Sequence, residues 1–268
     1  MPAAAAPKKA PVTPRPSASV IILTKSDKLL LVHRPNHLSF PNAHVFPGGV
    51  VSASDPSAAF CAARETFEET GLLFTTTAPP PSVDLPAAQT AIHSNTLTFN
   101  TFLSTHSLTL PLATFLPWST WTTPPQAPKR YRSQFFLAEL PAWIDELAEV
   151  RGDGGKEVVA GSARFVTPRE ALRQAREGEI VLFPPQLYMI TMLAEALEAG
   201  GRERVREVSS GEFGGREVLP KLARRDEKGR LWMDVGGGDV VVVELAEGGK
   251  GEPRAVEVIK GAVKGAKL

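Results

Sequence analysis

Short apolar runs alternate with polar, turn-forming segments at the start of the chain. The runs at 17–25 and 29–33 flank the polar residues 25–28, and this pattern predicts two strands of a hairpin. Residues 34–43 contain two prolines and two asparagines and predict a loop. A short strand is expected at 44–46, where the chain enters a Pro-Gly-Gly segment.

The most clearly marked element is a helix predicted over about 56–70. Asp55 is a favourable N-cap residue, and the proline that follows it suits the first helical position. Gly71 supplies a C-terminal stop. Phe60 and Phe67 lie on one side of this helix, which predicts an apolar face that packs on a sheet.

Apolar spacing also predicts the elements of the remaining chain. Residues 75–128 are rich in Ser, Thr and Pro and predict an insertion packed on the core, with short helices near 87–93 and 96–105. Further elements are expected as strands at 131–140 and 158–166, helices at 168–177 and 186–198, and late strands at 231–235, 240–245 and 255–259. This alternation predicts an α/β or α+β fold.

The same pattern divides the chain into three regions. Residues 1–16 predict a disordered tail, residues 17–200 one domain that includes the insertion, and residues 201–268 a small strand-rich extension. The alternative for the N-terminal tail is a mitochondrial transit peptide, although its five prolines disfavour the amphipathic helix that such a peptide needs.

Composition narrows the class of protein. The chain has 268 residues and a net charge of +1, so its overall field favours neither nucleic acid nor an anionic membrane. No apolar run approaches the roughly 18 residues of a membrane span. Cys61 is the single cysteine, which excludes an intramolecular disulfide. No histidine pattern accompanies it, so it is interpreted as a packing residue.

The last three residues resemble a peroxisomal address. Ala266-Lys267-Leu268 is similar to the Ser-Lys-Leu type of signal, with alanine in the small first position. This similarity predicts a peroxisomal import receptor as a partner and the peroxisome as the location. The alternative is an ordinary frayed basic tail, with the protein in the cytoplasm or the mitochondrion.

Three glutamates crowd one face of the predicted helix at 56–70. At about 100° per residue, Glu65, Glu68 and Glu69 fall within an arc of about 100°. Like charges at this spacing repel, and either water or bound cations relieve the repulsion. Mg²⁺ takes oxygen ligands and leaves positions for water and substrate phosphates. The alternative is a solvated acidic helix face.

The residues around these glutamates complete a recognisable motif. The set Gly49, Asp55, Arg64-Glu65, Glu68-Glu69 and Gly71 resembles the signature box of the Nudix hydrolase family. The resemblance implies an α/β/α sandwich with a mixed sheet, and hydrolysis of nucleoside diphosphates linked to another group. It also implies Mg²⁺ or Mn²⁺ held by Glu65, Glu68, Glu69 and the Gly48 carbonyl. Arg64 would orient a glutamate, and Glu65 or Glu69 would be the base.

Departures from the box point to one branch of the family. The acid is Asp55 rather than Glu, and eight residues rather than seven separate it from Arg64. Asp55 itself is either part of the site or only a helix cap. The segments at 30–34, 44–49, 121–124 and 135–138 are similar to the peroxisomal nudix-nineteen-type branch.

That branch implies cleavage of coenzyme A or acyl-CoA to 3′,5′-ADP and 4′-phosphopantetheine or its acyl form. One alternative is an enzyme that cleaves NADH, ADP-ribose or a dinucleoside polyphosphate. The other is a Nudix-like binding module without catalysis; retention of all three box glutamates disfavours it.

Several residues are candidates for substrate binding. Arg34 precedes the glycine pair in sequence, and Gly49 is a member of that pair. Lys129, Arg130 and Arg132 form a dense basic cluster that could grip a phosphate. The alternative for the cluster is a solvated basic strand edge. Gln186 follows two prolines at a predicted helix start, where it either touches substrate or only belongs to the helix start.

Overall fold

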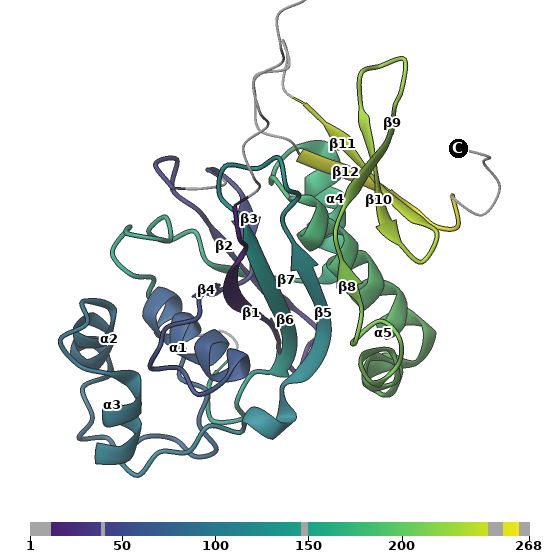
Figure 1. Cartoon of the computed structure of the whole chain (residues 1–268). Coiled ribbons are helices and arrows are strands. Elements are labelled where there is room, and N and C mark those ends of the chain that lie inside the picture. Colours follow the sequence, from purple (N-terminus) through teal and green to yellow (C-terminus); the bar gives the residue numbers. More distant parts are fainter. Residues whose placement is uncertain (1–11, 39–40, 146–149, 246–253, 263–268) are drawn as a thin grey trace, which may run out of the picture.

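The computed structural model describes residues 12–38, 41–145, 150–245 and 254–262, and its centre is a mixed sheet of eight strands (Figure 1). The order of the sheet is β3-β2-β1-β6-β5-β8, with β4 paired to β1 and β7 paired to β2. Its strands are β1 (Arg15–Leu23), β2 (Leu29–His33), β3 (His44–Val45), β4 (Gly48–Val50), β5 (Leu116–Thr122), β6 (Tyr131–Glu139), β7 (Arg164–Val166) and β8 (Glu217–Val218).

The parallel pair β1 and β6 forms the middle of the sheet. Its register runs from Arg15 opposite Tyr131 to Leu23 opposite Glu139. Both strands are covered on both faces, which explains why their apolar residues are nearly continuous in sequence. On β1, Ile21 faces one hydrophobic cluster and its neighbour Ile22 faces the other.

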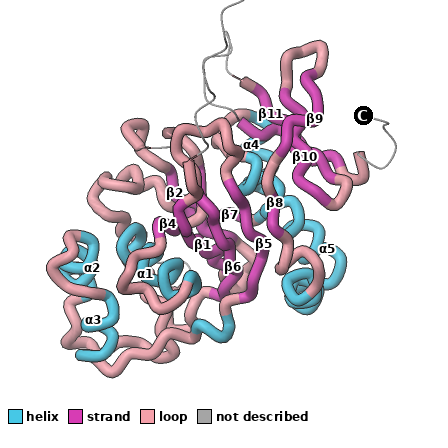
Figure 2. Tube along the Cα trace, viewed as in Figure 1, coloured by secondary structure: helices cyan, strands magenta, loops and turns pink. Residues whose placement is uncertain are grey.

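Helices cover both faces of this sheet and complete the expected α/β/α sandwich (Figure 2). Helix α1 (Ala58–Thr70) packs on one face, beside α2 (Leu85–His93) and α3 (Phe99–Thr105). Helices α4 (Pro168–Glu177) and α5 (Pro184–Ser210) pack on the other. The predicted fold class is therefore confirmed, and α1, the helix that carries the three glutamates, packs on the sheet as predicted.

The predicted start of α1 is wrong by two residues. The helix begins at Ala58, and the Ser57 side chain caps it by accepting a hydrogen bond from the Phe60 N–H at 3.1 Å. Asp55 is therefore not the cap, because its carboxylate contacts Arg64 and the Ser52 N–H. The predicted end is confirmed: Gly71 has φ 73°, a left-handed conformation that favours glycine.

The segment interpreted as an insertion contributes a strand to the central sheet. Residues 75–128 contain α2, α3 and a short 3₁₀ helix, η1 (Leu112–Thr114), but also β5, which lies between β6 and β8. Trp118 and Trp121 of β5 are buried in the core. The strand predicted at 158–166 is shorter than expected, since only β7 forms.

Helix α5 continues beyond its predicted end. Gly200 and Gly201 are not helical and kink it, after which the chain remains helical to Ser210. The extension therefore starts as helix rather than strand. Its later part is a four-stranded antiparallel sheet of β9 (Lys221–Arg225), β10 (Leu231–Gly236), β11 (Asp239–Glu244) and β12 (Arg254–Ile259). The last three strands match the three predicted runs, and β9 was not predicted.

Two predictions concern the ends of the chain, an N-terminal tail and a C-terminal import signal. Strand β1 begins at Arg15, within the predicted tail, whose first eleven residues lie outside the described part. The tripeptide Ala266-Lys267-Leu268 also lies outside it, so the import signal stays a prediction. In the part that is described, no helix is long and apolar enough to cross a membrane.

Candidate active site

A glycine loop lies directly against the acidic face of α1. The Gly48 N–H donates a hydrogen bond to Glu69 Oε2 at 3.0 Å. A Cβ on Gly49 would lie 2.5–2.6 Å from the carboxylate atoms of Glu65, and a Cβ on Gly48 would lie 2.1 Å from Ser19 Oγ. Gly48 is too close to the β1 backbone for any side chain and has a φ of 153°, whereas a side chain at Gly49 would displace the Glu65 carboxylate.

Arg64 connects this loop to the acidic residues. Its Nε and Nη2 donate to the two oxygens of Asp55 at 2.8 Å each, a bidentate contact. Its Nη1 lies 2.9 Å from Glu68 Oε1 and 3.0 Å from Glu65 Oε1. Because the Asp55 side chain has no exposed surface, the guanidinium is held from one side and can orient two glutamates on the other.

Burial and charge perturb the two innermost glutamates. Burial raises the pKa of Glu65 to about 7; the charges of Glu68 and Glu157 add to the rise and Arg64 opposes it. Burial, with the charges of Glu65 and Glu157, raises the pKa of Glu69 well above its usual range; the Gly48 N–H and Arg34 oppose that rise. The structure thus brings Arg34 near the site.

The donor chemistry of this cluster fits a hard divalent cation. Glu65 and Glu69 are buried carboxylates that repel one another, and a cation would relieve that repulsion. Glu68 shares Arg64 Nη1 with Glu65 through its Oε1, and its Oε2 lies 3.6 Å from His93 Nδ1. Over the described residues, no group of three or more His, Cys, Asp or Glu is arranged to hold a metal ion. The three-glutamate site with the Gly48 carbonyl therefore stays a prediction.

Glu157 is an acidic residue of the site that sequence reasoning missed. A turn around Asp153 positions it: the Asp153 carboxylate accepts hydrogen bonds from four successive N–H groups, including that of Glu157 at 2.5 Å. The Val159 N–H then binds the His33 carbonyl of β2 at 2.8 Å. No local motif marks Glu157, because it is far from α1 in sequence and reaches it only through folding.

Basic groups also occur beside Glu68, at positions that the sequence did not indicate. Glu68, His93, Arg151 and Lys156 line a polar cavity of about 360 Å³. The Gln89 side chain fixes its wall, because its Nε2 donates to both the Glu68 and Gly152 carbonyls at 2.9 Å. This cavity could accept phosphate oxygens next to the acidic cluster.

The basic cluster predicted to grip phosphate makes contacts within the chain. Arg130 donates to the carbonyls of Thr123 and Val12 at 3.0 and 2.7 Å, and Arg132 forms an ion pair with Glu217. Lys129 also has a partner within the chain. These contacts favour a structural role over a phosphate grip, but not at a strand edge, because β6 lies between β1 and β5 in the sheet. Cys61, buried with its Sγ 3.8 Å from the Gly49 carbonyl, is a packing residue as expected.

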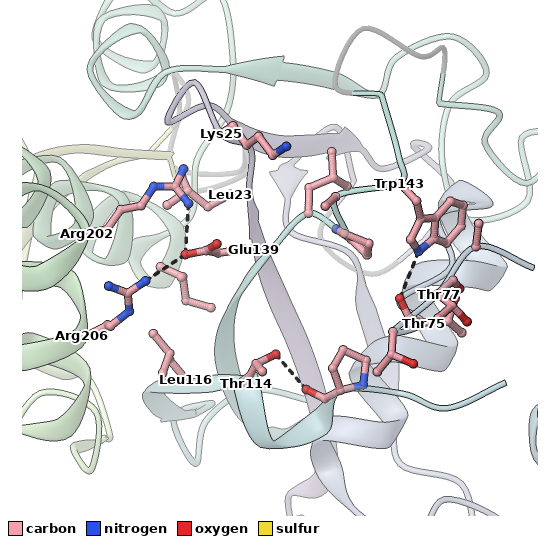
Figure 3. A pocket seen from close by; sticks show the side chains of 17 residues that line it. Leu23, Lys25, Thr75, Thr77, Thr114, Leu116, Glu139, Trp143, Arg202 and Arg206 are labelled. Carbon is pink, nitrogen blue, oxygen red and sulfur yellow. Dashed lines mark hydrogen bonds and ion pairs between the residues drawn. The ribbon is translucent and has the colours of Figure 1, made fainter.

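A larger cavity is separate from this cluster. It has about 900 Å³ and lies where β1 and β6 end, at Leu23 and Glu139 (Figure 3). The glycine loop instead pairs with the beginning of β1. Arg202 and Arg206 line the cavity, but both form ion pairs with Glu139, at 3.1 and 3.3 Å. It carries none of the acidic groups of the candidate site.

A mixed sheet between two helical layers, with a glycine loop facing a helix that bears three glutamates, defines the Nudix hydrolase class. A family model described as the NUDT19 Nudix domain matches residues 58–193, and the chain belongs to this family. The resemblance inferred from the sequence, including its branch, is thereby confirmed.

Two curated relatives show how far the similarity extends. A Caenorhabditis elegans protein named nudix hydrolase 7 is 29% identical over 194 residues, which cover 68% of this chain and 61% of the relative. The human acyl-coenzyme A diphosphatase NUDT19 is 27% identical over 236 residues, which cover 62% of this chain and 60% of the relative. The chain thus spans about three fifths of the length of both relatives.

A solved structure supports the fold independently. The crystal structure of a Nudix hydrolase from Alicyclobacillus acidocaldarius superposes with a TM-score of 0.58 at 23% identity. The match covers 69% of this chain and 92% of the solved chain. At this identity the likeness establishes the architecture.

Proposed function

We propose that this chain hydrolyses a diphosphate bond in a nucleoside diphosphate derivative and needs Mg²⁺ or Mn²⁺ to do so. The observation that carries the proposal is the buried pair Glu65 and Glu69 lying against the Gly48-Gly49 loop. Two buried carboxylates that repel each other destabilise this arrangement unless a cation binds or a proton is taken up.

The residues that would hold the metal are Glu65, Glu68, Glu69 and the Gly48 carbonyl, with Glu157 as an additional carboxylate. When bound, the ion would neutralise charge on the diphosphate oxygens and lower the pKa of the attacking water. Glu68 must first exchange its present contacts with Arg64 and His93 for the metal.

Other groups of the site position the carboxylates and accept a proton. Arg64 is a positioning residue, because it contacts Glu65 and Glu68 while Asp55 holds it. A carboxylate oxygen of Glu65, Glu69 or Glu157 accepts the proton of the attacking water. The Gly48 N–H holds Glu69 in place.

Coenzyme A or an acyl-CoA is the substrate that we propose, with 3′,5′-ADP and 4′-phosphopantetheine or its acyl form as products. The human relative named acyl-coenzyme A diphosphatase supports this substrate. Arg151 and Lys156, on the cavity beside Glu68, would bind phosphate oxygens. NADH, ADP-ribose and dinucleoside polyphosphates are the competing substrates, since the same acidic cluster would serve them.

The decisive experiment incubates the purified chain with Mg²⁺ or Mn²⁺ and a panel of these compounds, with products identified by mass. The Glu69→Gln variant is expected to lose about 100-fold or more in kcat, because a charged ligand or proton acceptor is lost. Glu203→Gln, an exposed glutamate on α5, is the matched control and should retain full activity. Undiminished turnover by Glu69→Gln would refute the proposal.

We also propose the peroxisome as the site of this reaction, on the basis of the predicted Ala266-Lys267-Leu268 signal. A fluorescent protein that carries residues 254–268 at its end should accumulate in peroxisomes. The same fusion with Leu268 replaced by Asp is the control, and diffuse fluorescence of both would contradict the location.

A further inference from the structure

A second pocket lies on the opposite face of the central sheet from α1. It has about 270 Å³ and is mostly apolar, with aromatic walls from Trp121, Tyr131, Phe135 and Phe183. Part of its lining comes from the C-terminal extension, through Pro220 and Met233. The pocket therefore lies between the sandwich and the small C-terminal sheet.

One polar group in this pocket has no partner. Gln186, in the first turn of α5, lines the pocket and is only 8% exposed. Its side-chain Oε1 is buried and accepts no hydrogen bond. A buried amide oxygen left unpaired is destabilising, so the position is stable only if another interaction offsets that cost or a ligand supplies a donor.

The pocket adjoins the glycine loop. Ser133 lines the pocket, and its β6 position pairs with Ser17 of β1, which pairs on its other side with Val50 of β4. Two strand spacings of about 4.8 Å each therefore separate the pocket from the strand that begins at Gly48. Val45, three residues before Gly48, also lines the pocket.

We infer that this pocket binds the adenine ring of the nucleotide, an inference that rests on the function proposed above. Aromatic walls offer stacking to a flat ring. The Gln186 amide can pair with adenine, since its Oε1 accepts from the exocyclic amine while its Nε2 donates to a ring nitrogen. An acyl chain would fit the apolar walls equally well but would leave Oε1 unpaired.

This inference gives the C-terminal extension a role in specificity. Met233 lies on β10, opposite Val241 of β11, and its flexible thioether forms part of the pocket wall. Sulfur makes favourable contacts with aromatic rings, and a methionine adapts its shape to an irregular ligand edge. The pocket is incomplete without the extension, so removing Met233 should weaken binding of the base.

The test compares two ligands that differ by one group. Calorimetry measures binding of ADP and of purine riboside 5′-diphosphate, which lacks the exocyclic amine, to the full chain. ADP is expected to bind about tenfold more tightly, the effect of one hydrogen bond. Gln186→Met should bind both ligands equally. Gln174→Met is the matched control, because Gln174 is also 8% exposed with an unpartnered Oε1 but lies on α4, and it should keep the preference.

Each result separates this inference from the proposed function. Equal binding of the two ligands by the unmodified chain overturns the inference, whatever happens to Gln186→Met on purification. A preference for ADP that survives in Gln186→Met overturns it as well. Met233→Ala should weaken ADP binding about two- to tenfold. An unchanged affinity for ADP would show that the extension has no role in binding the base. If ADP is preferred but no diphosphate is cleaved, the pocket stands and the proposed function fails.

Discussion

Asp55 offers the sharpest test of how the site is held together, because two roles predict opposite results. As a helix cap, it could be replaced by serine without loss, since serine and aspartate cap helices about equally well. As the residue that holds Arg64 in place, Asp55 could not be replaced by serine without loss. The structure assigns the cap to Ser57 and gives Asp55 two hydrogen bonds of 2.8 Å to the guanidinium.

The expected cost follows from burial and geometry. Asp55→Ser removes the buried partner of a charge, a change that costs about 3–5 kcal/mol where nothing else compensates. Arg64 keeps Glu65 and Glu68 as partners and its side chain is 11% exposed, so we expect about 2–3 kcal/mol of lost unfolding free energy. Ser57→Ala, which removes one cap, should cost about 1 kcal/mol.

Hydrolytic activity should further distinguish Asp55→Ser from Ser57→Ala. Without Asp55, the Arg64 guanidinium can turn away from Glu65 and Glu68, and loss of such a supporting contact typically lowers activity about 10- to 100-fold. Ser57→Ala should keep its kcat, since the Ser57 side chain contacts only the Phe60 N–H at the helix start.

Two assays are sufficient. Urea denaturation gives the unfolding free energies, and steady-state hydrolysis with Mg²⁺ gives kcat and KM. Raising the metal concentration should recover part of the Asp55→Ser activity under conditions in which circular dichroism shows the variant fully folded, so that stabilisation of the fold by the metal does not account for the recovery. An Asp55→Ser variant within about 0.5 kcal/mol of the unmodified chain and with unchanged kcat would refute the anchoring role.

Three further predictions concern other parts of the site and the fold. Gly49→Ala should abolish most activity, because the new Cβ would lie within 2.6 Å of the Glu65 carboxylate; near-normal kinetics would contradict the close approach. Glu157→Gln should lower kcat about 100-fold if this carboxylate takes the proton, with KM little changed. Burial, with the charges of His33 and Arg164, lowers the pKa of His44 to about 4, so the folded chain binds fewer protons than the unfolded chain below pH 6.5. Stability should therefore fall by about 1–2 kcal/mol between pH 7 and 5 relative to His44→Gln, measured by urea denaturation; equal pH profiles would refute this.

Local signals predicted the part of the site that lies on one helix. The spacing of Glu65, Glu68 and Glu69, the stop at Gly71 and the glycine pair before the helix are all short-range features. The helix start was predicted wrongly because Asp55 and Ser57 are both good caps, and only the position of Arg64 decides which of them is used.

Long-range placement could not be predicted in the same way. Strand β5 contains Pro117 and lies in a segment rich in threonine and proline, so the local sequence did not predict that it pairs with β6. Burial of its tryptophans in the core stabilises the strand there. Glu157 reaches the site through a turn fixed by Asp153, and Arg151 through the contact of Gln89 with Gly152. These contacts depend on the folded chain, and no periodicity marks them.

The two departures from the signature box explain each other. Aspartate is one methylene shorter than the glutamate that the box usually carries, so its carboxylate needs a backbone closer to Arg64. The additional residue between Asp55 and Arg64 lengthens the loop, and the Ser52 N–H binds Asp55 Oδ2 at 2.7 Å, which fixes the carboxylate toward the guanidinium. Both Asp55 oxygens then lie 2.8 Å from Arg64 nitrogens. A shorter acid on a longer loop thus still gives Arg64 a bidentate partner, and Arg64 in turn contacts Glu65 and Glu68.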